Sequence, residues 1–163
     1  MKKVLFWLCI LLTTGCIAPV KPINFINRAT WHNTTKDKLY SACLTSLQVQ
    51  GFNIYPSGTS KESGLIIAER EPFVPIAPGV VYQGVEGFYR LQIMVSEVQD
   101  NKIMVDINVK ASWRGKAEGI LLSKEHLQNC INNQLAEDME QLFLQMENLV
   151  GKADYYRRVT LQW

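Results

Sequence analysis

The side chains that could support catalysis are few and scattered. Neither His32 nor His126 has a companion at the spacing of a metal site, and the chain contains no CxxC, HExxH, Gly-rich phosphate loop or GxSxG motif. Glu69 and Glu71 would share one face of a strand, as residues on a solvated strand edge commonly do. We therefore expect a protein that is not an enzyme and that holds no metal or cofactor.

The cysteines raise a different kind of chemistry, beginning with Cys16. It follows a basic start (Lys2 and Lys3), an apolar run over residues 4–12 and the small residues of LLTTGC. An apolar run of this length is too short to cross a bilayer as a helix, and the three parts together indicate a cleaved secretory signal. The stretch resembles the bacterial lipoprotein signal, although Thr13 occupies the position where leucine is usual.

This resemblance implies a lipid anchor. Residues 1–15 would be the signal peptide, and Cys16 would become the acylated N-terminus, which holds the protein on a membrane without spanning it. In such lipoproteins an aspartate after the cysteine commonly marks inner-membrane retention, so Ile17 is compatible with transport to the outer membrane, where we expect the protein to face the periplasm. An ordinary cleaved signal and an uncleaved apolar N-terminus are the alternatives.

Composition excludes several other classes. The formal net charge is +2, and Lys2 and Lys3 account for it, so the mature chain would be neutral and would have no basic stripe for nucleic acid. A hydrophobic content of 47% supports a real core. After cleavage the chain is the size of one ordinary domain.

Periodicity and capping residues predict two helices and four strands. Residues 35–50 and 124–150 carry apolar stripes, with Asn33 or Thr34 as the N-cap of the first helix and Ser123 as the N-cap of the second. The strands are expected at residues 52–55, 64–71, 88–98 and 102–113.

The last two strands alternate clearly between apolar and polar residues. A three-residue loop over residues 99–101 places Val95 opposite Val105 and Ile93 opposite Ile107, whereas a two-residue loop would pair inward with outward side chains. The strand expected at residues 102–113 turns Asp106, Asn108, Lys110 and Ser112 toward the polar face.

The predicted order, helix–four antiparallel strands–helix, indicates an α+β two-layer sandwich with both helices on one sheet face. Its domain would span residues 34–151. Residues 16–33 would form a tether, from which Phe25 and Trp31 pack back onto the domain. Residues 152–163 would form a tail that adds a strand to its own sheet or to a partner's, or stays flexible.

Cys43 and Cys130 would both point into the core. In an oxidising compartment they would form a disulfide between the two helices, or remain two buried thiols that never meet.

A long connection between the second and third strands is the candidate contact surface. Residues 72–87 are rich in proline and glycine, and connections of this length are often functional. The alternative is a loop that folds back over the sheet or a sheet edge. The apolar side chains proposed for partner binding are Phe73, Val74, Ile76, Val80, Val81 and Tyr82.

Three features of the chain resemble those of small periplasmic lipoproteins. They are LTTGC, the segment GFNIYPSGTSKESGLIIAERE at residues 51–71 and the order of the elements. Such lipoproteins include the domains of the lipoprotein C subunit of the β-barrel assembly machinery and the lipopolysaccharide-assembly lipoprotein E. The resemblance implies a non-catalytic adaptor or structural subunit of an envelope assembly or transport complex, which binds another envelope protein. The first alternative is a carrier of a lipid or other apolar ligand under the long helix, and the second is an enzyme or inhibitor whose site residues are scattered along the sequence.

Overall fold

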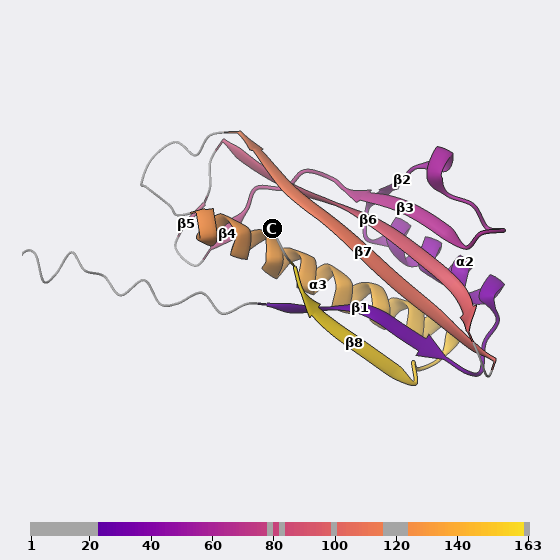
Figure 1. Cartoon of the computed structure of the whole chain (residues 1–163). Helices are drawn as coiled ribbons and strands as arrows, with labels where there is room; N and C mark the ends of the chain where they lie inside the picture. The colour runs from indigo at the N-terminus through magenta and orange to yellow at the C-terminus, as the bar shows by residue number, and fades with distance from the viewer. Residues whose placement is uncertain (1–22, 78–79, 82–83, 99–100, 116–123, 162–163) are drawn as a thin grey trace, which may run out of the picture.

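The computed structural model describes residues 23–77, 80–81, 84–98, 101–115 and 124–161 (Figure 1). Cys16, the predicted signal peptide, the rest of the predicted tether up to residue 22, Tyr82 and Ser123 lie outside these residues. The elements are β1 (Asn24–Trp31), α2 (Lys36–Val49), β2 (Phe52–Ile54), the short 3₁₀ helix η1 (Pro56–Gly58), β3 (Leu65–Arg70), β4 (Ile76–Ala77), β5 (Val80–Val81), β6 (Val85–Val98), β7 (Lys102–Gly115), α3 (Lys124–Val150) and β8 (Tyr155–Thr160).

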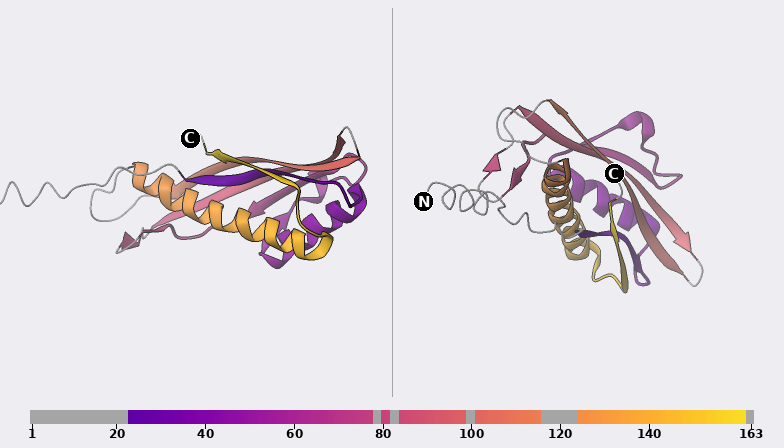
Figure 2. Two further views of the ribbon diagram at one scale, coloured as in Figure 1. Left: turned by 90° about the horizontal axis from the view of Figure 1, so that it is seen from below. Right: turned by 60° about the vertical axis from the view of Figure 1, so that its left-hand side comes forward.

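The fold is α+β, as predicted, with one main antiparallel sheet and two helices. The sheet has the strand order β2-β3-β6-β7-β1-β8, and β4 pairs with β5 in a separate hairpin. Both α2 and α3 lie on one face of the sheet (Figure 2). The sandwich has the two layers that the sequence indicates, but its sheet contains six strands rather than four.

The predicted tether is wrong over most of its described length, because residues 24–31 form β1 inside the sheet. β1 pairs with β7 on one side and with β8 on the other. Trp31 is buried, stacks on Phe143 with ring centroids 6.4 Å apart, and donates its indole N–H to the Gly151 carbonyl at 2.9 Å. The domain therefore begins at β1, before residue 34.

The C-terminal tail forms the edge strand β8. It pairs with β1 from Asn24↔Thr160 to Thr30↔Tyr155, which confirms pairing within the chain among the three alternatives. The register shifts between Ile26 and Arg28, where Asn27 is the extra residue of a β-bulge. This bulge breaks the alternation that would have marked residues 24–31 as a strand.

The register of the β6–β7 hairpin is the predicted one. Val95 pairs with Val105 and Ile93 with Ile107, and the ladder runs to Val98↔Lys102. Asn101 has φ of 56°, the left-handed conformation that a three-residue loop needs. The loop is therefore set by the burial of one face of both strands.

The core lies between α3 and the sheet. On α3 it contains Leu127, Cys130, Ile131, Leu135, Met139, Leu142, Phe143 and Met146, all of which are buried. Helix α2 begins one residue later than predicted, because the Thr35 side chain accepts from the Lys38 N–H and is the N-cap.

The predicted disulfide is wrong: Cys43 and Cys130 are both buried, and no bond joins them. Helix α2 lies against the last turns of α3, where Ala42 and Leu149 line one hollow. Cys130 lies near the start of α3, about 28 Å from Leu149 along the helix axis. A disulfide requires Cα atoms within about 7 Å, so the two helices cross too far from Cys130 to allow one.

Candidate binding surface on the open sheet face

One face of the main sheet is not covered by α2 or α3 (Figure 2). Alternate residues of β6 and β7 point to this open face, so Asp106, Asn108 and Lys110 lie where the alternation placed them. Sequence reasoning missed the residues that face them from β1 and β8, because both segments were assigned outside the domain.

Strand pairing aligns the open-face residues in rows across the sheet. One row contains a carboxylate and two cations, the next an aliphatic residue and two amides, and the third two apolar residues, a carboxylate and two arginines. In order across the strands, the rows are Glu69–Arg90–Lys110, Ile67–Gln92–Asn108 and Leu65–Met94–Asp106–Arg28–Arg157.

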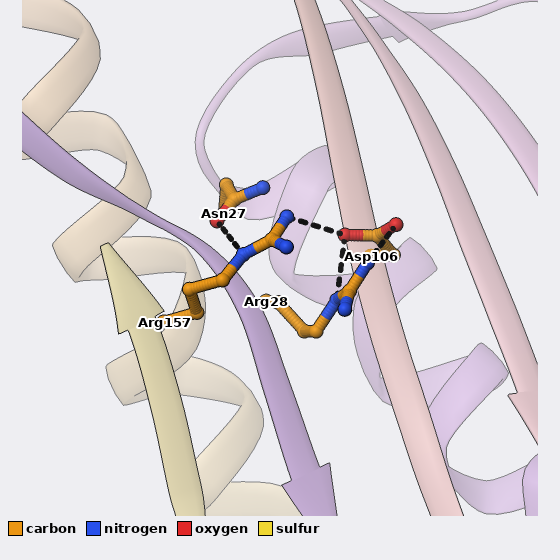
Figure 3. A network of polar contacts seen from close by, with 4 residues as sticks. All are labelled: Asn27, Arg28, Asp106 and Arg157. Atoms are coloured by element: carbon orange, nitrogen blue, oxygen red, sulfur yellow. Dashed lines mark hydrogen bonds and ion pairs between the residues drawn. The ribbon is translucent and has the colours of Figure 1, made fainter. Parts of the chain in front are cut away.

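Two arginines share one carboxylate in the third row (Figure 3). Arg28 donates from Nε to Asp106 Oδ1 at 3.1 Å and from Nη2 to Asp106 Oδ2 at 2.9 Å. This hydrogen bonding raises the pKa of Arg28. Arg157 places Nη2 3.7 Å from Asp106 Oδ1 and donates from Nε to Asn27 Oδ1 at 3.1 Å. The group retains one excess positive charge.

Two cations also face each other in the first row. Arg90 directly opposes Lys110 on the neighbouring strand, a like-charge pair that is unfavourable on a sheet. Arg90 donates from Nε and Nη2 to Glu69 Oε2 at 2.9 and 2.7 Å, so one oxygen of that carboxylate accepts both hydrogen bonds. Among the described residues, no carboxylate forms an ion pair with Lys110.

Two hollows lie on either side of Asn108 in the second row. β1 pairs with β7 only from Arg28 to Trp31, and beyond this point the strands separate around a hollow of about 290 Å³ that reaches from Asn27 to Asn108. A second hollow of about 220 Å³ lies over Asn108 and Lys110 and extends to Ile67. Both hollows are lined by Asn108, and Asn27 at the far side of the first accepts a hydrogen bond from Arg157 of the third row. We call the two hollows, together with the first and third rows that border them, the trough.

The segment predicted for partner binding lies at the end of the fold where β1 begins (Figure 1). Phe73 forms an isolated bridge with Gly87 on the edge of β6 and packs edge-on against Tyr89, with ring centroids 6.0 Å apart. Val74 is 47% exposed. The start of this segment thus covers a sheet edge, and Val74 is its clearest exposed apolar side chain.

The other predicted contact residues are described by their backbone alone or lie outside the described residues. Ile76 pairs with Val81, and Ala77 with Val80, in the β4–β5 hairpin. Their role in partner binding stays a prediction, as does that of Tyr82.

A second polar cluster lies partly buried on the helix side of the sheet. Asp138 on α3 accepts hydrogen bonds from the Tyr89 hydroxyl and from Gln134 Nε2, the latter at 3.1 Å. Arg70 Nε lies 3.0 Å from Asp138 Oδ2, and Arg70 Nη1 donates to the Gln50 carbonyl at 3.0 Å. Burial, followed by the charge of Asp138, raises the pKa of Tyr89, so this hydroxyl stays a neutral donor. The cluster ties α3 to β3 and β6.

The structure offers little room for an apolar ligand under α3. Ile131, Leu135 and Met139 are fully buried there. Within the described ranges, no three His, Cys, Asp or Glu side chains are grouped closely enough to hold a metal ion. No helix in the same part of the chain has the length and apolar character needed to cross a membrane.

Comparisons with known proteins give only weak structural matches. No protein-family model and no curated protein matches the chain. Two solved structures of the adenylate sensor from AMP-activated protein kinase match with a TM-score of 0.41 and 14% identity. The match to the sensor in complex with ZMP covers 72% of this chain and 92% of the sensor chain. The match to the sensor in complex with ATP covers 75% of this chain and 95% of the sensor chain. At this score the likeness carries no argument about function.

Proposed function

We propose that this protein is a lipid-anchored periplasmic adaptor or structural subunit of an envelope assembly or transport complex, held on the outer membrane through Cys16. It binds another envelope protein through the open sheet face. The observation that carries the proposal is the face of the six-stranded sheet that neither α2 nor α3 covers, on which half-exposed apolar residues are mixed with arginines.

The composition of this face supports a protein partner. Met94 is 37% exposed on β6, and Leu65 and Met104 on the neighbouring strands are partly exposed beside it. Arginine and methionine are enriched where proteins bind one another. Packing under α3 favours the adaptor over the carrier, because the fully buried Ile131 and Met139 occupy the place that a ligand would need.

The experiment is site-specific photo-crosslinking in native membranes. A photoreactive amino acid replaces Gln92 at the centre of the open face, or the matched glutamine Gln141, which is exposed on α3. We expect a discrete crosslinked protein from position 92 and none from position 141. A third probe at Val74 tests the predicted contact segment.

Crosslinking from all positions alike, or from none, would contradict the adaptor function. Anchoring has a separate test: Cys16→Ala should release the protein from membranes. Unchanged fractionation would refute the lipid anchor.

A further inference from the structure

We propose, building on the adaptor function above, that the trough binds an extended, acidic segment of the partner protein. Two acidic residues four positions apart in this segment would contact the two cationic rows, and the chain between them would lie over Gln92 and Asn108. The proposal depends on charge, spacing and the chemistry of the intervening row.

The charge of the trough is not balanced by its own residues. Arg28, Arg90, Lys110 and Arg157 face only two carboxylates in the described part of the chain, those of Glu69 and Asp106. Both carboxylates already receive arginine hydrogen bonds. Lys110 and Arg157 are therefore the cations with most capacity left for an incoming carboxylate.

The spacing of the cations sets the spacing of the ligand's charges. Lys110 and Asp106, the residue that Arg157 approaches, are four positions apart on β7, which corresponds to about 13 Å in a strand. An extended peptide that follows β7 rises by the same amount over four residues. Its two carboxylates would then reach the two rows together.

The row between the cations suits a peptide backbone. Gln92 and Asn108 are exposed, directly paired across β6 and β7, and carry both donors and acceptors. Ile67 lines the hollow beside them. The site thus offers hydrogen bonds at its centre and positive charge at both ends.

The orientation of the trough favours a protein segment over lipid headgroups. The open face runs along the length of α3, whereas β1 begins at one end of the fold (Figure 2). The first described residue is seven positions from Cys16, so an anchor there would make this the end of the fold nearest the bilayer. The trough would then open sideways into the periplasm, toward neighbouring proteins.

The test uses the full-length protein purified in a neutral detergent and fluorescein-labelled peptides. The probe is Thr-Glu-Thr-Thr-Thr-Glu-Thr, in which threonine favours the extended form. The controls carry glutamine in place of both glutamates, or the two glutamates at adjacent positions. Fluorescence anisotropy gives the dissociation constants.

The matched variants are K110Q/R157Q and K152Q, in which Lys152 is an exposed lysine beyond the end of α3. A surface ion pair changes a dissociation constant by about two- to fivefold, so the double variant should weaken binding by about four- to 25-fold. K152Q should bind like the wild type, added salt should weaken binding, and both control peptides should bind less well.

Equal binding by the double variant, or by the glutamine peptide, would overturn the inference. Displacement of the probe by dihexanoyl phosphatidylglycerol, but not by dihexanoyl phosphatidylcholine, would assign the trough to lipid headgroups instead. The two proposals fail separately. If a partner crosslinks at position 92 and K110Q/R157Q still crosslinks to it, only the proposal of an acidic segment is refuted. If the probe peptide binds the trough but no partner crosslinks, the trough proposal stands and only the adaptor function is refuted.

Discussion

Replacing Asp138 with alanine should cost about 3–5 kcal/mol of unfolding free energy. The side chains of Arg70 and Asp138 are 26% and 13% exposed, so the lost partner leaves a largely buried guanidinium without its counter-charge. Because Arg70 keeps its hydrogen bond to the Gln50 carbonyl, we expect losing the ion pair to cost about 2–3 kcal/mol, the low end for breaking a buried pair. The Tyr89 hydroxyl also loses its acceptor in the core, which adds about 1–2 kcal/mol.

Urea unfolding followed by circular dichroism measures this change, provided that the m-value stays constant. Asp138→Asn should cost less than Asp138→Ala, because its amide oxygen still accepts a hydrogen bond from Tyr89. Glu69→Gln, which breaks the exposed pair with Arg90, is the matched control and should cost at most about 1 kcal/mol. A cost for Asp138→Ala below about 1 kcal/mol, or equal to that of Glu69→Gln, would refute the reasoning.

Three further predictions concern stability. Gly64→Ala should destabilise the protein far more than Gly151→Ala in urea unfolding, although both glycines have positive φ. A Cβ at Gly64 would overlap the Val95 carbonyl oxygen. A Cβ at Gly151 would meet open space, so Gly151→Ala should lower the unfolding free energy by only about 1–2 kcal/mol. Burial raises the pKa of the Cys43 thiol to about 12, so stability should fall above pH 9 by up to about 1.4 kcal/mol per pH unit. Cys43→Ala should reduce that slope, and an unchanged slope would contradict the assignment. Trp31→Phe should cost about 1–3 kcal/mol through its lost hydrogen bond and packing, whereas a negligible cost would contradict a stabilising role for the Trp31 indole.

The parts of the fold that the sequence predicted are those with an uninterrupted pattern. The strict alternation around Val95 and Val105 determines the hairpin register, because a one-residue slip would turn every apolar side chain out of the core. The stripe from Leu127 to Met146 likewise identifies α3.

The missed parts depend on contacts between distant residues. β1 carries Asn27 at a bulge and Arg28 on the open face, so it reads as an irregular polar segment until its pairing with β7 and β8 is known. The trough shares this origin. Alternation places Asp106 on the polar face, but nothing local shows that Arg28 and Arg157 lie beside it.

The pairing of the first strand with the last has a consequence for how the chain folds. Asn24 and Thr160 are neighbours in the sheet although they are 136 positions apart in the sequence. Such contacts give the fold a high contact order, which slows folding because a long loop must close before the contacts form. β1 cannot gain its outer neighbour until the last residues of the chain have been synthesised. An incomplete chain therefore lacks a finished sheet, and the edge that β8 occupies on β1 stays unpaired until synthesis ends.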